Sequence, residues 1–247
     1  MLKSIRPDRF RKKILPPAPP PPEPLKILSY LNGGVIYVAY GQPAKAACQA
    51  SIASLKRMHP SGLQVAVISD TPIPGADTQI VRPELDIGAR EYKTQAYQYS
   101  PYDHTLYLDA DTLVVGSLAA GFSALAAGWD IVAALDYRQT VGRVDHLPQD
   151  DIDATIAITG TGEYPHINTG MLFFRKSTET EELFNLWHSE WLNFKYRDQG
   201  AFVRALHQSN VKLWTLAWQW NTHRQERALH VFHNHHQVDR TWKGLPQ

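Results

Sequence analysis

The residues best suited to chemistry are two aspartates that directly follow an apolar, strand-like segment. Asp109 and Asp111 come after residues 104–108, whose composition is typical of a buried strand. Asp151 and Asp153 have the same spacing in a polar stretch, so spacing alone carries little information. Two unpartnered carboxylates at the end of a buried strand cost free energy, which a divalent cation offsets. Because side chains two apart on an extended segment project to one side, Asp109 and Asp111 are predicted to bind one hard cation.

A group of histidines near the C-terminal end offers further metal ligands. Four of the 11 histidines lie between His230 and His236. Alternation along a strand would place His233 and His235 on one side. Histidine with carboxylates suits Mn²⁺ better than Mg²⁺, which prefers an all-oxygen shell. The alternative is a solvated histidine-rich segment that binds transition metals without a function.

The elements that must position these groups alternate between strands and helices. Residues 35–40 and 63–69 are short, β-rich apolar runs, and between them Cys48, Ile52 and Leu55 fall on one helical face. A strand, a helix and a strand this close together form a βαβ unit, which predicts a largely parallel sheet.

Three strand-like segments of the chain end at an aspartate, namely Asp70, Asp109 and Asp136. In open α/β sheets, ligands bind beyond the carboxyl ends of the strands, so these positions are expected to surround the site. The same patterns predict further elements: helices over 89–99, 118–125, 178–194 and 199–207, and strands over 131–135, 171–174 and 211–216. Thr178 and Glu181 have capping-box spacing at one helix start. Residues 137–166 are polar, and we expect an irregular, mobile cover there.

The composition is that of a globular protein. The chain has 247 residues, of which 43% are hydrophobic and 20% charged, enough for one domain over 25–247. Residues 1–24 form a basic, proline-rich segment with seven prolines from Pro16 to Pro24. We expect this segment to be a disordered tail, which acts as a spacer or docks a proline-binding partner.

Charge and cysteine content indicate which kinds of binding partner and which cellular compartment to expect. The net charge is +1, which argues against a nucleic-acid or anionic-lipid partner. Cys48 is the single cysteine, so no internal disulfide forms, as is typical of a reducing compartment. The N-terminal region lacks the apolar stretch of a signal peptide, and the charge-free run at 112–129 has the pattern of a short soluble helix. The sequence predicts a cytoplasmic protein without a transmembrane segment.

Four segments resemble glycosyltransferase family 8 in the same order. LYLDADTLVVGSL at 106–118 resembles the metal-binding segment of these retaining nucleotide-sugar transferases, which include glycogenin and lipopolysaccharide galactosyltransferases. Residues 164–177, 197–202 (RDQGAF) and 218–221 (WQWN) resemble three later segments of the family. The resemblance covers about residues 35–236. It implies a GT-A, Rossmann-like α/β fold, in which helices flank a mostly parallel central sheet in a single domain.

The resemblance also implies roles for individual residues, carried over by position. The metal would be held by Asp109, Asp111 and either His233 or His235. The nucleotide-sugar donor would be bound by Tyr37, Ala39, Tyr40, Asp70, Arg90, Lys93 and the Asp109-Ala110-Asp111 segment. The sugar and acceptor site would contain Asn168, Thr169, Gly170, Asp198 and Gln199, with Asp136, Asp198 and Gln199 as the catalytic candidates. The chain departs from the family after the histidines, which leaves Lys243 without an assigned role.

By this resemblance, the chain transfers a hexose from a UDP-sugar to a carbohydrate or other hydroxyl acceptor, with retention and with Mn²⁺ or Mg²⁺. An alternative is a haloacid-dehalogenase-like phosphatase with Asp109 as nucleophile and Asp111 as acid/base. A second alternative is a non-catalytic module that binds a nucleotide sugar. Single residues also have structural alternatives, because Asp198 could cap the next helix and Lys93 could lie on a solvated face.

Overall fold

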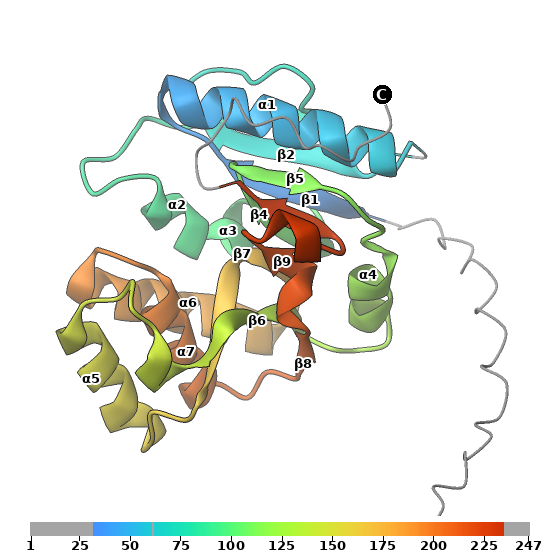
Figure 1. The fold of residues 1–247 in the computed structure, drawn as a ribbon. Helices are drawn as coiled ribbons and strands as arrows, with labels where there is room; N and C mark the ends of the chain where they lie inside the picture. Colours follow the sequence, from blue (N-terminus) through green and yellow to red (C-terminus); the bar gives the residue numbers. More distant parts are fainter. Residues whose placement is uncertain (1–31, 61, 235–247) are drawn as a thin grey trace, which may run out of the picture.

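A central sheet between two layers of helices forms the body of the protein (Figure 1). The computed structural model describes residues 32–60 and 62–234. The main sheet has seven strands in the order β3-β2-β1-β4-β7-β6-β8. These strands are β1 (Gly33–Val38), β2 (Gln64–Ser69), β3 (Thr78–Val81), β4 (His104–Asp109), β6 (Ile131–Thr140), β7 (Pro165–Arg175) and β8 (Leu213–Leu216). All except β7 run in the same direction, which confirms the predicted α/β class with a mostly parallel sheet.

The helices divide between the two faces of the sheet (Figure 1). One face is covered by α1 (Gly41–Met58) and α4 (Ala119–Ala126). The other is covered by α2 (Arg90–Thr94), α3 (Ala96–Tyr99), α6 (Thr178–Phe194) and α7 (Gln199–Gln208). Side chains of β1 alternate between the two faces of the sheet. Ile36 and Val38 pack in the buried cluster on one face, while Val35 and Tyr37 pack in the cluster on the other.

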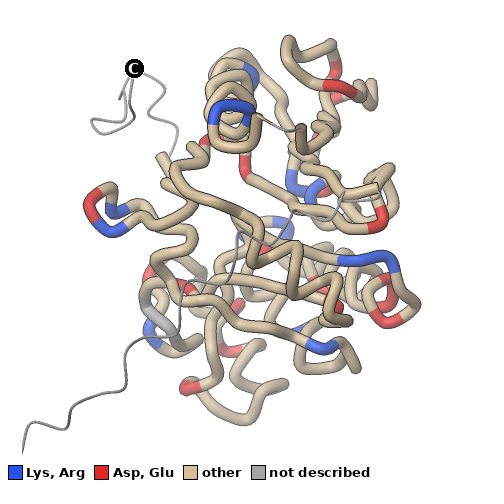
Figure 2. Tube along the Cα trace, turned by 90° about the vertical axis from the view of Figure 1, so that its right-hand side faces the viewer, with Lys and Arg blue, Asp and Glu red and all other residues tan. Residues whose placement is uncertain are grey.

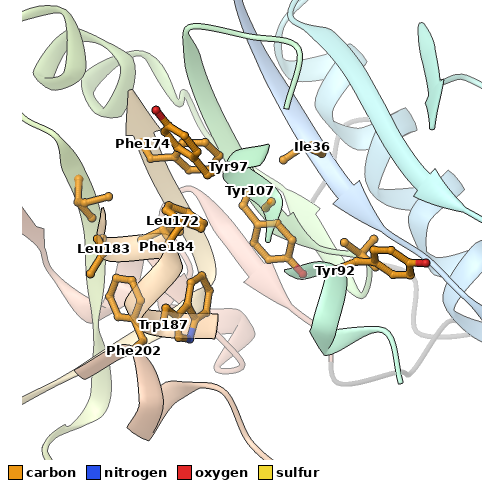
Figure 3. Close-up of a cluster of buried hydrophobic side chains, with 14 of the residues drawn as sticks. Ile36, Tyr92, Tyr97, Tyr107, Leu172, Phe174, Leu183, Phe184, Trp187 and Phe202 are labelled. Atoms are coloured by element: carbon orange, nitrogen blue, oxygen red, sulfur yellow. The ribbon is translucent and has the colours of Figure 1, made fainter. Parts of the chain in front are cut away.

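Aromatic side chains fix α6 and α7 to the sheet (Figure 3). The rings of Phe174 and Phe184 lie 4.8 Å apart between centroids, and those of Trp187 and Phe202 lie 4.9 Å apart. Each of these rings is at most 2% exposed, so burial and ring contacts both stabilise the layer. The loop between the two helices is thereby held at one edge of the sheet.

The antiparallel strand β7 places its first residues beside the carboxyl ends of its neighbours. Its Met171 is paired with Leu108 of β4, so Gly170 comes next to Asp109. On its other side, Asn168 is paired with Ala134 of β6. Residues from three strands therefore meet at one edge of the sheet.

A smaller sheet, built largely from the C-terminal part of the chain, lies at the same edge. It has three strands in the order β5-β10-β9, namely β5 (Thr112–Val114), β10 (Val231–His233) and β9 (Asn221–Thr222). β10 runs antiparallel to β5 and parallel to β9. The segment after Asp111 is thus joined to a segment more than a hundred residues later.

The structure corrects the expected irregular cover at 137–166. β6 continues to Thr140, a 3₁₀ turn follows at Val141–Arg143, and helix α5 (Gln149–Thr159) occupies the middle of the segment. Apolar side chains at 141, 144, 147 and 152 pack with Val203 of α7 in a small buried cluster. This contact between segments far apart in the sequence gives the segment a buried core, which its polar composition did not indicate.

Two helix predictions also need correction. The helix expected over 89–99 is two short helices, α2 and α3, separated at Gln95. The expected capping box at Thr178 and Glu181 is displaced by one residue, since Ser177 is the N-cap and its hydroxyl accepts a hydrogen bond from the Thr180 N–H. The other expected elements are present, but β7 starts six residues before the strand expected over 171–174, and β6 ends five residues beyond the strand expected over 131–135.

Charge is distributed evenly over the described chain, with basic and acidic residues interspersed along the trace (Figure 2). Among the helices of residues 32–60 and 62–234, none combines the length and hydropathy needed to span a membrane. The predicted proline-rich tail at 1–24, His235 and Lys243 lie outside the described residues.

Candidate functional site

Two carboxylates and one imidazole converge at the carboxyl edge of the sheet. His233 Nε2 lies 3.1 Å from Asp111 Oδ1 and 3.8 Å from Asp109 Oδ2. One ligand atom from each of the three residues lies within 4.8 Å of the others. The resemblance assigned Asp109, Asp111 and either His233 or His235 to a metal site, and the structure brings the first three together.

The pairing of β10 with β5 explains how His233 reaches the aspartates. His233 is opposite Thr112 in this antiparallel pair. The backbone N–H of Asn234 donates to the carbonyl oxygen of Asp111 at 2.7 Å, which extends the pairing to the edge of the site. The position of the imidazole is therefore set by backbone hydrogen bonds.

The donor set fits a divalent cation. Carboxylate oxygens with one imidazole nitrogen suit Mn²⁺ and related ions. A Cβ at Gly170 would lie 2.8 Å from both Asp109 Oδ2 and His233 Cε1, so only glycine leaves the three ligands room to converge. Burial lowers the pKa of His233, but the adjacent carboxylates of Asp111 and Asp109 outweigh burial and raise it overall. The imidazole is thus in a strongly negative environment, where a cation is stabilised.

Lys93 contacts both a candidate metal ligand and a catalytic candidate. Its ammonium lies 3.0 Å from Asp109 Oδ1 and 3.0 Å from Asp198 Oδ2, and it is buried. Burial lowers the pKa of Lys93, yet the two carboxylates outweigh burial and raise it overall. Lys93 is therefore a buried cation and not part of a solvated helix face.

Asp198 is held by several partners just before α7. Its Oδ2 accepts a hydrogen bond of 2.6 Å from the Thr169 hydroxyl, and Arg90 Nε lies 3.6 Å from its Oδ1. Burial raises the pKa of Asp198, but Lys93, Thr169 and Arg90 outweigh burial and lower it overall. Asp198 is the N-cap residue of α7, but its side chain makes no capping hydrogen bond. Its carboxylate contacts Lys93, Arg90 and Thr169 instead.

Two asparagines connect β7 with β9. Asn168 Nδ2 donates to the carbonyl oxygen of Asn221 at 3.2 Å, and Asn221 Nδ2 donates to Asn168 Oδ1 at 3.1 Å. The N–H of Gly170 also donates to Asn168 Oδ1, at 3.0 Å. These bonds hold the start of β7 in place beside the metal ligands.

All these groups line a cavity of about 620 Å³, a size typical of small-molecule sites. The sequence-predicted residues in its lining are Tyr40, Arg90, Lys93, Asp109, Ala110, Asp111, Asp136, Asn168, Thr169, Gly170, Asp198, Gln199 and His233.

Three residues assigned to the nucleotide pocket do not line this cavity. Alternation along the strand turns Tyr37 toward α1, where its hydroxyl accepts a hydrogen bond from Ser51 at 3.1 Å. Ala39 is fully buried in the same layer. The carboxylate of Asp70 is 2.7 Å from Lys45 Nζ.

The cavity also contains residues that the sequence did not single out. The Tyr107 hydroxyl donates to Asp109 Oδ1 at 2.8 Å. The sequence could have indicated Tyr107, because it lies two residues before Asp109 on the same strand, and such positions share a face. His146, whose Nε2 lies 2.5 Å from Gln199 Oε1, and Arg197 carried no such signal. Tyr137, Thr222 and His223 are further lining residues outside the prediction, and Asn221 also lines the cavity but had been given no role within the WQWN segment.

Solved glycosyltransferases share this fold. The galactosyltransferase LgtC, in a complex with donor and acceptor sugar analogues, is 17% identical with a TM-score of 0.53, and the match covers 78% of this chain and 77% of LgtC. Mouse xyloside xylosyltransferase 1 is 12% identical with a TM-score of 0.55, over 81% of this chain and 96% of that protein. The bifunctional glycosyltransferase WbbM is 16% identical with a TM-score of 0.52, over 78% of this chain and 40% of WbbM.

No protein-family model and no curated protein sequence matches this chain. The likeness therefore lies in the three-dimensional arrangement. The chain has the GT-A fold of nucleotide-sugar glycosyltransferases.

Proposed function

We propose that this protein is a metal-dependent glycosyltransferase that moves a hexose from a UDP-sugar to a hydroxyl group of a carbohydrate acceptor, with retention. The observation that carries the proposal is the convergence of Asp109, Asp111 and His233 at the edge of the cavity. In a GT-A fold, this edge is where a sugar donor is expected to bind. Apart from Tyr37, Ala39 and Asp70, the described site residues carried over from family 8 line the same cavity.

Asp109, Asp111 and His233 would hold Mn²⁺, or Mg²⁺ in its place. When bound, such a cation neutralises the negative charge of the departing diphosphate and orients it. Lys93, 3.0 Å from Asp109, adds a fixed positive charge on the same side. Arg90 extends this positive region toward solvent, since its side chain is 46% exposed.

Asp198 is the principal candidate for stabilising the sugar. Positive charge develops at the anomeric carbon as the diphosphate leaves, and a preorganised carboxylate stabilises that charge. Asp198 is kept ionised and immobile by Lys93 and Thr169. Gln199, held by His146, and Asp136, which lines the same cavity, are the other polar groups that would contact the donor sugar or the acceptor.

A binding experiment tests the proposal most directly. Thermal unfolding is followed with a panel of nucleoside diphosphates and nucleotide sugars, with Mn²⁺ or with EDTA, for the wild type and for Asp109→Asn/Asp111→Asn. A ligand at about 100 times its Kd should stabilise the wild type by roughly 2.7 kcal/mol. We expect this gain with a uridine nucleotide and Mn²⁺, and we expect EDTA or the double substitution to abolish it.

The other outcomes are equally informative. Stabilisation that survives EDTA and the double substitution contradicts the metal-dependent donor site. If no nucleotide stabilises the wild type, the glycosyltransferase proposal fails, and beryllofluoride trapping of Asp109 tests the phosphatase alternative. Donor binding without transfer to any acceptor, and without donor hydrolysis, indicates the non-catalytic module.

A further inference from the structure

One cationic side chain in the cavity lining has no acidic partner in the described part of the chain. Lys93 pairs with Asp109 and Asp198, and Arg90 lies 3.6 Å from Asp198. Arg197 lines the same cavity, yet within residues 32–60 and 62–234 no carboxylate lies within ion-pair distance of its guanidinium. Its Nε is buried and has no hydrogen-bond partner among the described residues. Because Nε is shielded, a ligand in the cavity would meet the terminal N–H groups of Arg197, and a guanidinium without a carboxylate partner favours an anionic group on that ligand.

The surroundings of Arg197 indicate which ligand this is. Arg197 and Gln199 flank Asp198, and Gln199 contacts His146, which also lines the cavity. Lys93 contacts both Asp109 and Asp198. Asp198 and its neighbours Arg197 and Gln199 therefore lie on the side of Lys93 that is away from the candidate metal ligands. Lys93 and Arg90 already supply positive charge for a donor diphosphate. Arg197 is therefore better placed for the other substrate, the acceptor.

Aromatic side chains also line the cavity. Tyr137, 37% exposed, and His223 both line the cavity, and their ring centroids are 5.8 Å apart. Trp218 packs edge-on against Tyr137, with centroids 5.5 Å apart. The guanidinium of Arg224 lies 4.1 Å from the Tyr137 centroid. Exposed aromatic rings with a polar edge suit the apolar face of a sugar ring, and a second arginine adds positive charge beside them.

We propose that the acceptor is an anionic carbohydrate, whose carboxylate or phosphate pairs with Arg197 while its sugar ring lies against Tyr137. The inference rests on the proposed glycosyltransferase function and narrows its substrate class. Arginine matches either anion because its planar fork donates two parallel hydrogen bonds. Neutral sugars would leave the guanidinium without a partner.

The test compares acceptors that differ only at C6, which carries a neutral CH2OH, a carboxylate or a phosphate. Methyl glycosides of glucose, galactose and mannose are each supplied as the neutral sugar, the uronic acid and the 6-phosphate, at a fixed concentration of the donor that binds. We measure kcat/KM for transfer and, separately, donor hydrolysis without acceptor. The wild type should prefer at least one anionic form over its neutral partner by about tenfold or more. The uronic-acid and phosphate arms tell the two anions apart.

Arg197→Gln should remove this preference by raising KM for the anionic acceptor, an effect much larger than its effect on donor hydrolysis. Arg197→Lys should restore part of it, because the charge returns without the planar fork. Arg227→Gln is the matched control, since Arg227 is exposed and lies outside the cavity lining. This control should behave as the wild type does.

Several outcomes would overturn the inference while leaving the proposed function intact. One is equal use of neutral and anionic acceptors by the wild type, and another is use of no anionic sugar in the panel. A loss of donor hydrolysis in Arg197→Gln would assign Arg197 to the donor instead. If no donor binds or is hydrolysed at all, it is the glycosyltransferase proposal that fails.

Discussion

Tyr107 orients the carboxylate of Asp109 in the candidate metal site. Its hydroxyl donates to Asp109 Oδ1 at 2.8 Å, and Lys93 contacts the same oxygen at 3.0 Å. Burial, followed by the adjacent carboxylate of Asp109, raises the pKa of Tyr107 well above its usual value, so the phenol stays a donor. Such outer partners of metal ligands hold the ligand in its binding orientation.

Tyr107→Phe should therefore weaken Mn²⁺ binding by about 10- to 100-fold, the usual effect of removing an outer-shell partner. Metal affinity is measured by calorimetric titration, and the fold is checked by thermal unfolding. Tyr97→Phe is the matched control, because its hydroxyl donates to the Ser177 carbonyl on the α6 side of the sheet. Unchanged Mn²⁺ affinity in Tyr107→Phe would show that Asp109 is positioned without this bond.

At the scale of elements, a buried arginine joins three helices next to the site. Arg204 of α7 donates to Asp151 Oδ1 of α5 at 2.5 Å and to Glu190 Oε2 of α6 at 2.9 Å. Arg204 and Asp151 are each 1% exposed. Because α7 begins directly after Asp198, this contact also supports the catalytic candidates.

Removing the arginine alone leaves a carboxylate buried without its charge partner. Arg204→Met should lower the free energy of unfolding by about 3–5 kcal/mol, and Arg204→Met/Asp151→Leu should recover part of that loss. Urea unfolding measures both variants. Lys56→Met is the control, since it breaks an exposed pair with Asp77 and should cost at most about 1 kcal/mol. A double variant less stable than Arg204→Met would contradict this account.

Helices α5, α6 and α7 also show which parts of the structure the sequence could predict and which it could not. Local patterns were sufficient for β1, α1, β2, α6 and α7, whose apolar spacing matches the face they bury. They were insufficient for α5, whose core is made with residues 141–147 and Val203, and whose Asp151 is neutralised 53 residues later by Arg204. Contacts at this distance along the chain leave no local periodicity.

For the candidate site, the motifs predicted residues at strand ends and on helices alike, but not every residue that lines the cavity. Asp109, Asn168 and Asp198 follow from their motifs and lie in one cavity. Tyr37 was placed in the pocket, but strand alternation turns it toward α1. His146 and Arg197 reach the cavity only through the packing of the segments that precede α5 and α7, which no spacing in the sequence records.

At the scale of the whole molecule, the candidate metal site depends on two segments far apart in the chain that pair closely. Next to β5, the N–H groups of Val115 and Gly116 donate to the His230 carbonyl oxygen at 2.8 and 3.1 Å. A Cβ at Gly116 would come 2.1 Å from the carbonyl oxygen of Leu229. This neighbour is backbone, so a side chain at position 116 must push the segment before β10 away.

Gly116→Ala should therefore weaken Mn²⁺ binding although residue 116 touches none of the three ligands. Displacement of residues 229 and 230 moves His233, while Asp109 and Asp111 stay on β4 and its turn, so the ligand set loses its imidazole. We expect a fall in Mn²⁺ affinity of about tenfold or more in a calorimetric titration, as for other changes that misplace a ligand. Ser117→Ala is the control, because it changes an exposed neighbour and keeps the backbone contact to His230. If Gly116→Ala bound Mn²⁺ as tightly as Ser117→Ala, the pairing of β5 with β10 would not be what brings His233 to the aspartates.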